Sequence, residues 1–448
     1  MAGFMIAAAH KSSGKTMVST GLAHALADHG VQTFKKGPDY IDPMWLGLAS
    51  GRACYNLDYN VMDADEIRAF YQARAGSLSL VEANKGLFDG VAFDGSDASA
   101  ALAKLLQIPV VLVVDCSGIT RGIAPLLIGY QAFDKDLNIA GVILNKTATP
   151  RHEGKLMAAV ETYTDLPVLG AISRRADLTL GERHLGLITP SETEQAAAKV
   201  ATIGRVVAEA VDLDAIRELA KGAADIPARA PTTVSSHPPN IRVAIARDRA
   251  FGFYYPDDIE AFAMAGAELV PFDTLSDPAL PESDALFIGG GFPETQAAGL
   301  AANQSLRADI KQKIENGLPT YAECGGLMYL SNSLNWQGQT YPMVGVVAGD
   351  VVMHERPQGR GYTRFAKTTA HPWPGVGNDV RAHEFHYASI ENLPETTEFA
   401  RRVLRGTGID GSSDGIVIHN LLAGFCHLRA TASNPWVENF VNFVRQKR

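Results

Sequence analysis

The sequence predicts an α/β protein made of two doubly wound domains. Three observations lead to this prediction: apolar runs of strand length, helical patterns between them, and one segment where this alternation stops. Helical patterns lie at 16–30 and 95–107, and the strand-like runs of the first half are FMIAAA (4–9), QTFKK (32–36), LSLVE (78–82), PVVLVVD (109–115) and IAGVILN (139–145). Continuous apolar strands that alternate with helices are typical of a mostly parallel sheet covered on both faces.

The alternation stops at KGAADIPARAPTTVSSHPPN, residues 221–240, which is rich in Pro, Ala, Ser and Thr. This composition without apolar periodicity indicates an interdomain linker. After it, IRVAIARD, AELVPF, ALFIGGG and PTYAECGG restore the strand pattern. A chain of 448 residues is also too long for one ordinary domain. We therefore expect domains at 1–220 and 241–448.

The composition narrows the class of protein. The chain is 46% hydrophobic and 20% charged, and 49 acidic against 40 basic residues give a net charge of −9. This balance disfavours bulk binding to nucleic acid or anionic membranes. No apolar run approaches the roughly 20 residues of a membrane span, and Lys11 and Lys15 interrupt the N-terminal run, unlike a signal peptide. Four cysteines without CxxC spacing fit a reducing cytoplasm.

The stretch AAAHKSSGKT, residues 7–16, predicts a phosphate-binding loop, although alanine stands where the pattern usually has its first glycine. It lies between a predicted strand and a predicted helix, whose N-terminal amides favour an anion. Lys15 can reach the β- and γ-phosphates of ATP, and the Thr16 hydroxyl can bind Mg²⁺. The small residues that would let backbone N–H groups approach phosphate oxygens are Ser12, Ser13 and Gly14.

Carboxylates follow several of the predicted strands. Asp39 and Asp42 come after QTFKK, Glu82 ends LSLVE, Asp89 follows seven residues later, and Asp115 ends PVVLVVD. The carboxyl ends of parallel strands meet in one crevice, where ligands bind in this class of fold. Because Mg²⁺ prefers carboxylate and phosphate oxygens, we expect a metal and substrate site there.

A second site is predicted around Cys324, at a turn between a strand and a helix in PTYAECGGLMYL. A helix start favours the thiolate form of such a cysteine. The glycine run of ALFIGGGFPE, at 289–291, can donate backbone N–H groups to an oxyanion. A thiolate of this kind needs a histidine, and we choose His427, which follows a short apolar run. The other candidates are His383, His386 and His419.

A nucleotide site joined to a reactive cysteine suggests ATP-driven amidation fed by glutamine hydrolysis. The chain resembles the cobyrinic acid a,c-diamide synthase family, glutamine-dependent amidotransferases that act on tetrapyrrole side chains. The matching segments, in the family's order, are FKKGPDYIDPMW (34–45), GLFDG (86–90), VVLVVDCSG (110–118), GVILNKTATPRHE (141–153), GGGFPE (289–294), AECGGLMYL (322–330), GRGYTRF (359–365) and AHEFHYAS (382–389).

The resemblance implies an N-terminal P-loop, dethiobiotin-synthetase-like domain and a C-terminal flavodoxin-like class I glutamine amidotransferase domain. ATP with Mg²⁺ would phosphorylate an acetate carboxylate of the macrocycle, and ammonia released from glutamine would form the amide, at the a and c positions in turn. The partners implied are glutamine, ATP and a tetrapyrrole polycarboxylate, without nucleic acid or membrane, and we keep a homodimer as one expectation.

The resemblance also assigns roles to individual residues. Cys324 and His427 would be the catalytic pair of the glutaminase. The implied Mg²⁺ ligands are Thr16, Asp39 and Glu82. The implied substrate and acyl-phosphate residues are Asp39, Tyr40, Asp42, Lys85 and Asp89, and the implied oxyanion and glutamine residues are Gly290, Gly291, Phe292 and Gly325.

Three departures from the family pattern matter. The phosphate loop has fewer glycines than is usual, and EANK replaces the usual EGVM before GLFDG, which places Lys85 near the active crevice. The histidine of many related enzymes is followed by Pro-Glu, whereas His427 is followed by Leu-Arg, so a Cys-His dyad is implied, with Glu323 as an additional aid.

Two alternatives remain beside a corrin substrate. The same chemistry could act on sirohaem or a metal sirohydrochlorin, because scattered positions form the macrocycle surface. The chain could also be a partitioning-type ATPase switch with a non-catalytic amidotransferase-like domain, although the retained Cys324, His427 and glycine run argue against it.

Overall fold

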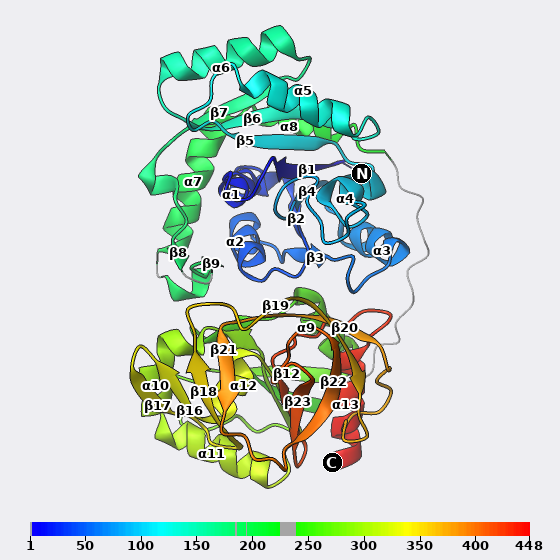
Figure 1. Cartoon of the computed structure of the whole chain (residues 1–448), viewed down its shortest axis with the longest axis vertical. Helices are drawn as coiled ribbons and strands as arrows, with labels where there is room; N and C mark the ends of the chain where they lie inside the picture. The colour runs from blue at the N-terminus through cyan, green and yellow to red at the C-terminus, as the bar shows by residue number, and fades with distance from the viewer. Residues whose placement is uncertain (1, 184–185, 194, 225–238) are drawn as a thin grey trace. The chain divides into compact units, whose positions relative to one another are not determined.

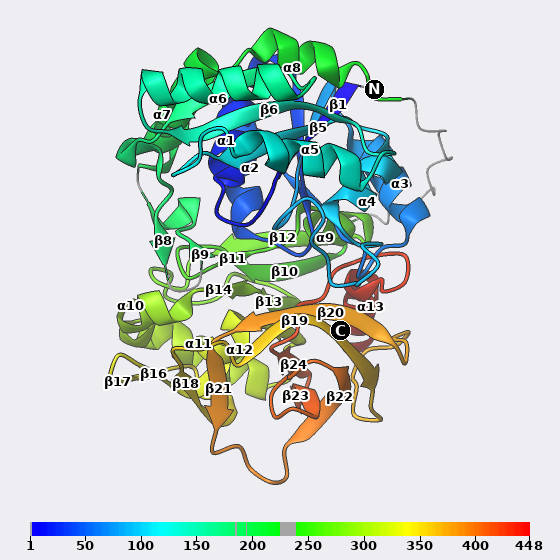
Figure 2. The same ribbon diagram turned by 45° about the horizontal axis from the view of Figure 1, so that its top comes forward.

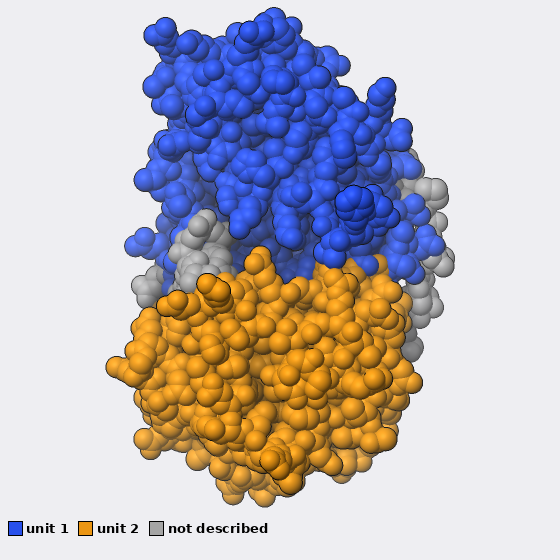
Figure 3. Space-filling model, viewed as in Figure 1, with its two compact units in different colours: residues 1–59, 63–231 blue, residues 60–62, 232–448 orange. Residues whose placement is uncertain are grey.

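The structure is a computed structural model that describes residues 2–183, 186–193, 195–224 and 239–448. The chain divides into two compact units, residues 1–59 with 63–231 and residues 60–62 with 232–448 (Figure 3). The division after residue 231 falls within the predicted linker, most of which (225–238) lies outside the described residues. Along the described part of the chain, no helix is both long and apolar enough to cross a membrane.

The first unit is built on a seven-stranded sheet in which every neighbouring pair is parallel. The strand order β3-β2-β4-β1-β5-β6-β7 places β1 between β4 and β5. The strands are β1 (Ala2–Ala8), β2 (Val31–Lys36), β3 (Tyr55–Leu57), β4 (Leu78–Glu82), β5 (Val110–Asp115), β6 (Ile139–Thr147) and β7 (Val168–Ser173). The five predicted strands are all present, and β3 and β7 complete the sheet.

Helices flank this sheet on both sides (Figures 1 and 2). Phe4, Ile6 and Ala8 of β1 share one apolar core with α1, α2, α7 and α8, because alternate residues of a strand face the same side. The helices are α1 (Lys15–Ala25), α2 (Ile41–Ser50), α3 (Ala64–Arg74), α4 (Ser99–Leu106), α5 (Ile123–Phe133), α6 (Pro150–Tyr163), α7 (Ala196–Ala210) and α8 (Leu213–Ala220). The helical pattern at 16–30 is shorter than predicted, since α1 ends at Ala25.

The second unit contains a nine-stranded sheet whose first five strands are parallel and whose last four are antiparallel. In spatial order the strands are β12 (Ala267–Phe272), β10 (Ile241–Ala246), β13 (Ala285–Ile288), β15 (Thr320–Glu323), β24 (Leu421–Gly424), β23 (Ser413–Ile418), β22 (Glu398–Arg405), β19 (Gly359–Lys367) and β20 (Val380–His386). The parallel part is the predicted α/β arrangement, and the antiparallel part extends it.

Two smaller sheets complete the second unit. A four-stranded sheet consists of β17 (Gln339–Pro342), β16 (Ser331–Trp336), β18 (Val347–Met353) and β21 (Ala388–Glu391), and a short ribbon pairs β11 (Phe251–Phe253) with β14 (Gly290–Gly291). The helices are α9 (Pro256–Met264), α10 (Ala297–Ala302), α11 (Gln304–Glu315), α12 (Gly325–Leu330) and α13 (Trp436–Lys447).

Candidate active sites

The predicted phosphate loop connects β1 to α1. Gly14 precedes the helix with a φ of 91°, a left-handed conformation that favours glycine. A Cβ atom at this position would lie 2.2 Å from Nδ2 of Asn145, and this amide donates a hydrogen bond of 2.8 Å to the Ser13 carbonyl. Ala9 has no positive φ, so an alanine is accommodated where the usual pattern has glycine.

Two side chains at the end of β6 hold the loop in place. Lys146, in β6, donates to the Ser12 carbonyl at 2.9 Å and to Oδ2 of Asp115 at 2.7 Å. Ser13 Oγ donates to the carbonyl of His10 at 2.8 Å, so it is engaged within the loop. The Asn145-Lys146 pair therefore shapes the loop from the end of β6.

Lys15 and Thr16 begin α1 and turn toward the carboxyl end of β4. Lys15 Nζ donates to the Lys85 carbonyl at 2.6 Å, and Thr16 Oγ1 donates to Oε1 of Glu82 at 3.0 Å. Burial, and then the positive charge of Lys35, lower the pKa of Lys15. An anion near Lys15 would offset both effects, as expected of a phosphate-binding lysine.

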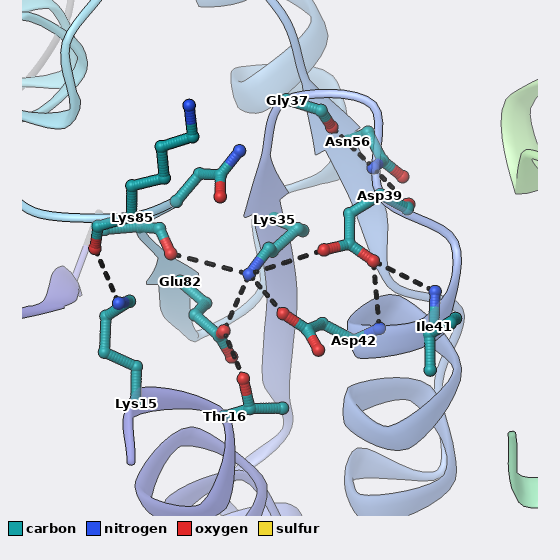
Figure 4. A network of polar contacts seen from close by, with 12 residues as sticks. Lys15, Thr16, Lys35, Gly37, Asp39, Ile41, Asp42, Asn56, Glu82 and Lys85 are labelled. Atoms are coloured by element: carbon teal, nitrogen blue, oxygen red, sulfur yellow. Dashed lines mark hydrogen bonds and ion pairs between the residues drawn. The ribbon is translucent and has the colours of Figure 1, made fainter. Parts of the chain in front are cut away.

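A buried lysine that the sequence analysis did not select lies at the centre of the predicted carboxylate cluster (Figure 4). Lys35 Nζ is 2.5 Å from Oδ2 of Asp42, 2.7 Å from Oε1 of Glu82 and 3.8 Å from Oδ2 of Asp39. Lys35 lies in β2, next to β4, which supplies Glu82. One ammonium group thus joins three carboxylates from two segments of the chain, the turn into α2 and the end of β4.

The charges in this cluster depend on one another. Burial acts to lower the pKa of Lys35, but Asp42, Glu82 and Asp39 raise it well above its ordinary value, so the ammonium form persists. Burial acts to raise the pKa of Asp42, but Lys35 lowers it overall. Burial and the charge of Asp42 raise the pKa of Asp39 to about 7. Burial likewise raises the pKa of Glu82. Burial and the neighbouring negative charge therefore favour the protonated form of Asp39 more than water does.

The backbone between β2 and α2 is organised by Asp39. Its Oδ1 accepts from the backbone N–H of Ile41 at 3.0 Å and of Asp42 at 3.1 Å, at the start of α2. Asn56 Nδ2 donates to the carbonyls of Gly37 and Asp39, at 2.8 and 2.7 Å. Tyr40 is partly buried and immediately precedes α2. The second oxygen of Asp39 faces Lys35.

Lys85 and Asp89 belong to the segment that follows β4. Lys85 is exposed and has a φ of 52°, which is uncommon for a residue other than glycine. Asp89 is exposed, and its Oδ2 accepts from the backbone N–H of Gly86 at 3.0 Å. Since the Lys85 carbonyl already accepts from Lys15, this segment and the phosphate loop adjoin.

The predicted Mg²⁺ ligands have the oxygen chemistry that this ion prefers. Thr16 and Glu82 are hydrogen-bonded to each other, and Glu82 Oε2 is buried without a hydrogen-bond partner among the described residues. A buried acceptor of this kind fits a cation. No group of three acidic, histidine or cysteine side chains is arranged to hold a metal within the described ranges. The Thr16 hydroxyl and phosphate oxygens would therefore have to supply the remaining ligands.

The second predicted site lies between β15 and α12. Cys324 has a φ of 48° and a ψ of −102°, so the chain turns sharply at this residue. Its N–H donates to the Gly424 carbonyl at 2.8 Å, which fixes the turn to β24. A Cβ atom on Gly326 would lie 2.3 Å from the Ile288 carbonyl, so only glycine fits there. Cys324 is 7% exposed, so a small reagent can reach it only partly.

His427 follows β24, beside the turn. Burial alone lowers the pKa of His427, but Cys324 and then Glu323 raise it to about 10. Glu323 Oε2 is 3.4 Å from His427 Nδ1. The other oxygen of Glu323 accepts from the Tyr321 hydroxyl at 2.5 Å and from the Leu428 N–H at 2.8 Å. The structure therefore groups a thiol, a histidine and a carboxylate.

The glycine run lies against this group. A Cβ atom on Gly290 would lie 2.6 Å from Cε1 of His427, and one on Gly325 would lie 3.1 Å from the Gly291 nitrogen. The Phe292 N–H donates to the Ala250 carbonyl at 2.9 Å and is engaged within the protein. Gly290, Gly291 and Gly325 thus adjoin Cys324 and His427, while the Phe292 amide is directed at another carbonyl.

The remaining candidate histidines occupy different places. His386 stacks on Phe425, with ring centroids 3.9 Å apart. His419 follows β23 with a φ of 54°. His383 stacks on His427 itself, a contact that its position 44 residues earlier in the sequence does not reveal.

Comparisons with known proteins bear on both units. Residues 4–188 match the CobQ/CobB/MinD/ParA nucleotide binding domain, and residues 242–435 match the CobB/CobQ-like glutamine amidotransferase domain. The chain is 44% identical to a cobyrinate a,c-diamide synthase of Magnetococcus marinus, over 99% of this chain and 97% of that protein. An enzyme of the same name from Methanosarcina acetivorans is 38% identical, over 96% of this chain and 92% of that protein. Another from Dehalococcoides mccartyi is 37% identical, over 98% of this chain and 97% of that protein.

Proposed function

The chain belongs to the cobyrinate a,c-diamide synthase family, and we propose that it amidates the a and c acetate carboxylates of cobyrinic or hydrogenobyrinic acid through an acyl phosphate. It is a glutamine-hydrolysing, amide-forming ligase with a nucleotide-binding domain. The observation that carries the proposal is that Cys324, His427 and Glu323 lie together in the second unit. The first unit of the same chain holds Lys15 at the predicted phosphate loop and Lys35 among its carboxylates. Four free, buried cysteines fit a reducing cytoplasm as its place of action.

The first unit would activate the carboxylate. The loop from Ser12 to Thr16 would bind the ATP phosphates through backbone N–H groups and Lys15. Thr16, Asp39 and Glu82 would hold Mg²⁺, which neutralises phosphate charge when bound. A substrate carboxylate oxygen would attack the γ-phosphorus, the bond to the β-phosphate oxygen would break, and ADP would leave. Asp42, held by Lys35, would help to set the charge around the acyl phosphate, together with Tyr40, Lys85 and Asp89.

The second unit would supply ammonia. The Cys324 thiolate would attack the γ-carboxamide carbon of glutamine, and His427 would give a proton to the departing nitrogen. Water would then hydrolyse the thioester to glutamate and restore the thiol. Gly290, Gly291 and Gly325 adjoin this position and would surround the oxyanion. Ammonia would displace phosphate from the acyl phosphate and form the amide.

A second macrocyclic substrate remains a candidate because of Lys85. Lys85 is exposed beside the Lys15 contact, and a basic side chain there could pair with an additional substrate carboxylate. Sirohaem or a metal sirohydrochlorin is therefore the second candidate substrate.

The test is a mass-spectrometric assay of the full chain with ATP, Mg²⁺ and glutamine against cobyrinic acid, hydrogenobyrinic acid, sirohaem and metal sirohydrochlorins. We expect two successive amidations of a corrin-type acid, each replacing a hydroxyl with an amino group. Diamidation of only a sirohydrochlorin would support the alternative. If the protein neither hydrolyses glutamine nor amidates any of these compounds, both candidate functions are contradicted. That result would favour a nucleotide-dependent binding protein.

A further inference from the structure

A second histidine lies flat against the histidine of the glutaminase. The rings of His383 and His427 are stacked, with centroids 4.9 Å apart and an interplanar angle of 15°. Their backbones pair as well: the His427 N–H donates to the His383 carbonyl at 2.8 Å, and the His383 N–H donates to the His427 carbonyl at 3.3 Å. Both residues are buried, so the surrounding fold holds the two rings in the stacked arrangement.

Charged and titratable groups surround the pair on several elements. Glu323 and Cys324, at the end of β15, face His427. Arg429, two residues beyond His427, donates from Nε to Asp257 Oδ2 in α9 at 3.0 Å. The Arg429 guanidinium also lies 4.9 Å from the ring centroid of Tyr255, whose ring is 6.3 Å from that of His383.

These surroundings favour different protonation states for the two rings. Burial, then His427, and then Arg429 lower the pKa of His383 well below its ordinary value, so its ring is neutral. His427 is instead favoured as an imidazolium by Cys324 and Glu323, against the effect of burial. A neutral aromatic face stacked on a cation within about 6 Å stabilises the charged form.

We propose that His383 is a positioning residue of the glutaminase, whose neutral ring fixes the plane of His427 and stabilises the imidazolium formed when Cys324 becomes a thiolate. In that step the proton leaves Sγ and moves to Nε2 of His427, since Nδ1 faces Glu323. The S–H bond breaks, an N–H bond forms, and no other reagent is needed. The proposal deepens the glutaminase part of the proposed function and depends on that part alone.

Because the backbones of the two residues pair independently of the side chain, substitutions at position 383 can separate the effect of the ring from that of the strand pairing. Any side chain other than proline at position 383 leaves the two N–H···O bonds with His427 available. His383→Leu removes the ring, whereas His383→Phe keeps a flat aromatic face that cannot titrate. His386→Leu is a matched control, since His386 is buried in the same strand and stacked, but on Phe425.

The measurement is the rate at which iodoacetamide alkylates Cys324 in the full chain as a function of pH, followed by peptide mass spectrometry. It requires neither ATP nor a tetrapyrrole, so failure of amidation on every macrocycle would leave the result intact. We expect His383→Leu to alkylate about tenfold more slowly at pH 7 and to reach half its plateau about one pH unit higher, because the thiolate loses part of its stabilised partner. His383→Phe and His386→Leu should stay within about twofold of the natural chain.

A His383→Leu profile equal to that of the natural chain would overturn the proposal. So would a His383→Phe variant as slow as His383→Leu, because the flat ring would then not be what matters. An equal loss in His386→Leu would assign the effect to the strand and overturn it as well. If His383→Leu fails to fold, His383→Gln, which is planar but lacks a ring, takes its place with the same expectations.

Discussion

Glu323 and Cys324 are neighbours in the chain, and the turn at Cys324 lets both of them interact with His427. The turn has a positive φ, a conformation that costs free energy for a residue with a side chain. Glu323 is held by Tyr321 and by the Leu428 N–H, so one of its oxygens remains directed at His427. The carboxylate that precedes Cys324 in the chain thus lies next to His427, as its expected role of an aid to the Cys-His pair requires.

Replacement of Glu323 should therefore affect the histidine. Glu323→Gln removes one of the groups that raise the pKa of His427, which is about 10 in the intact protein. With a raised pKa, the imidazolium is present below about pH 10 and is lost as the pH rises through it. We expect glutaminase kcat to fall about tenfold and the alkaline limb of its pH profile to move to lower pH. An unchanged alkaline limb in steady-state glutaminase assays would contradict a role for this carboxylate.

Gly14 is the residue on which the phosphate loop depends most directly. Gly14→Ala would place a methyl group 2.2 Å from Asn145 Nδ2 and would strain a φ of 91°. We expect ATP affinity to fall at least about 100-fold, because the loop amides would no longer point to the phosphates. Calorimetric titration with a non-hydrolysable ATP analogue measures this. Gly51→Ala is a suitable control, since its φ of 67° is similar but its added Cβ meets open space.

At the scale of elements, β2 and β4 determine the electrostatics of the proposed synthetase site. Their parallel register places Lys35 opposite Glu82, and the turn into α2 brings Asp39 and Asp42 to the same ammonium group. Buried charges of one sign are stable only when they are paired. Lys35 therefore permits several carboxylates to be gathered where a nucleotide and a metal are expected.

Removal of Lys35 should destabilise the first unit. Lys35→Met leaves Glu82 and Asp42 without their cation, and we expect a loss of about 3–5 kcal/mol in unfolding free energy. Because the carboxylate pKa values would then rise, the variant should regain stability as the pH falls. Differential scanning calorimetry at two pH values measures both effects. Lys104→Met breaks an exposed pair with Asp134 and should cost less than about 1 kcal/mol; a similar loss in both variants would contradict the argument.

At the scale of the whole molecule, each unit has its own apolar core, and the proposed function assigns one half of the reaction to each. A core of the first unit joins β1 to α1, α2, α7 and α8. In the second unit, one apolar core includes Cys324, and another includes Trp436, Phe440 and Phe443 of α13. Amide formation needs the product of one site at the other. The two sites should therefore respond differently to the source of nitrogen.

Two variants separate these contributions. Cys324→Ala should lose glutamine-dependent amidation and keep ammonium-dependent amidation, because only the glutaminase nucleophile is removed. Lys15→Ala should lose at least about 100-fold of the rate with either nitrogen source, because phosphoryl transfer precedes both. Its Cys324 should still be alkylated at the natural rate. Product formation with glutamine and with ammonium chloride measures these outcomes, and loss of both rates in a folded Cys324→Ala protein would refute the role assigned to the thiol.

The sequence by itself determined the features that depend on neighbouring residues. Apolar periodicity predicted the α/β class of both units, the phosphate-loop pattern predicted the strand–loop–helix at Gly14, and the order of the motifs predicted the family. The sequence shows these signals because the residues that form each one, such as the apolar residues of a strand or helix and the small residues of a tight turn, lie within a few positions of one another.

Only the tertiary structure decided which distant side chains meet. Lys35 became the common partner of three carboxylates through strand register, Glu323 approached His427 through the turn at Cys324, and His383 reached His427 by backbone pairing. The four antiparallel strands that extend the second sheet bring β20, and His383 with it, to this position. Contacts of this kind depend on the register and packing of elements far apart in the chain, which local patterns do not encode.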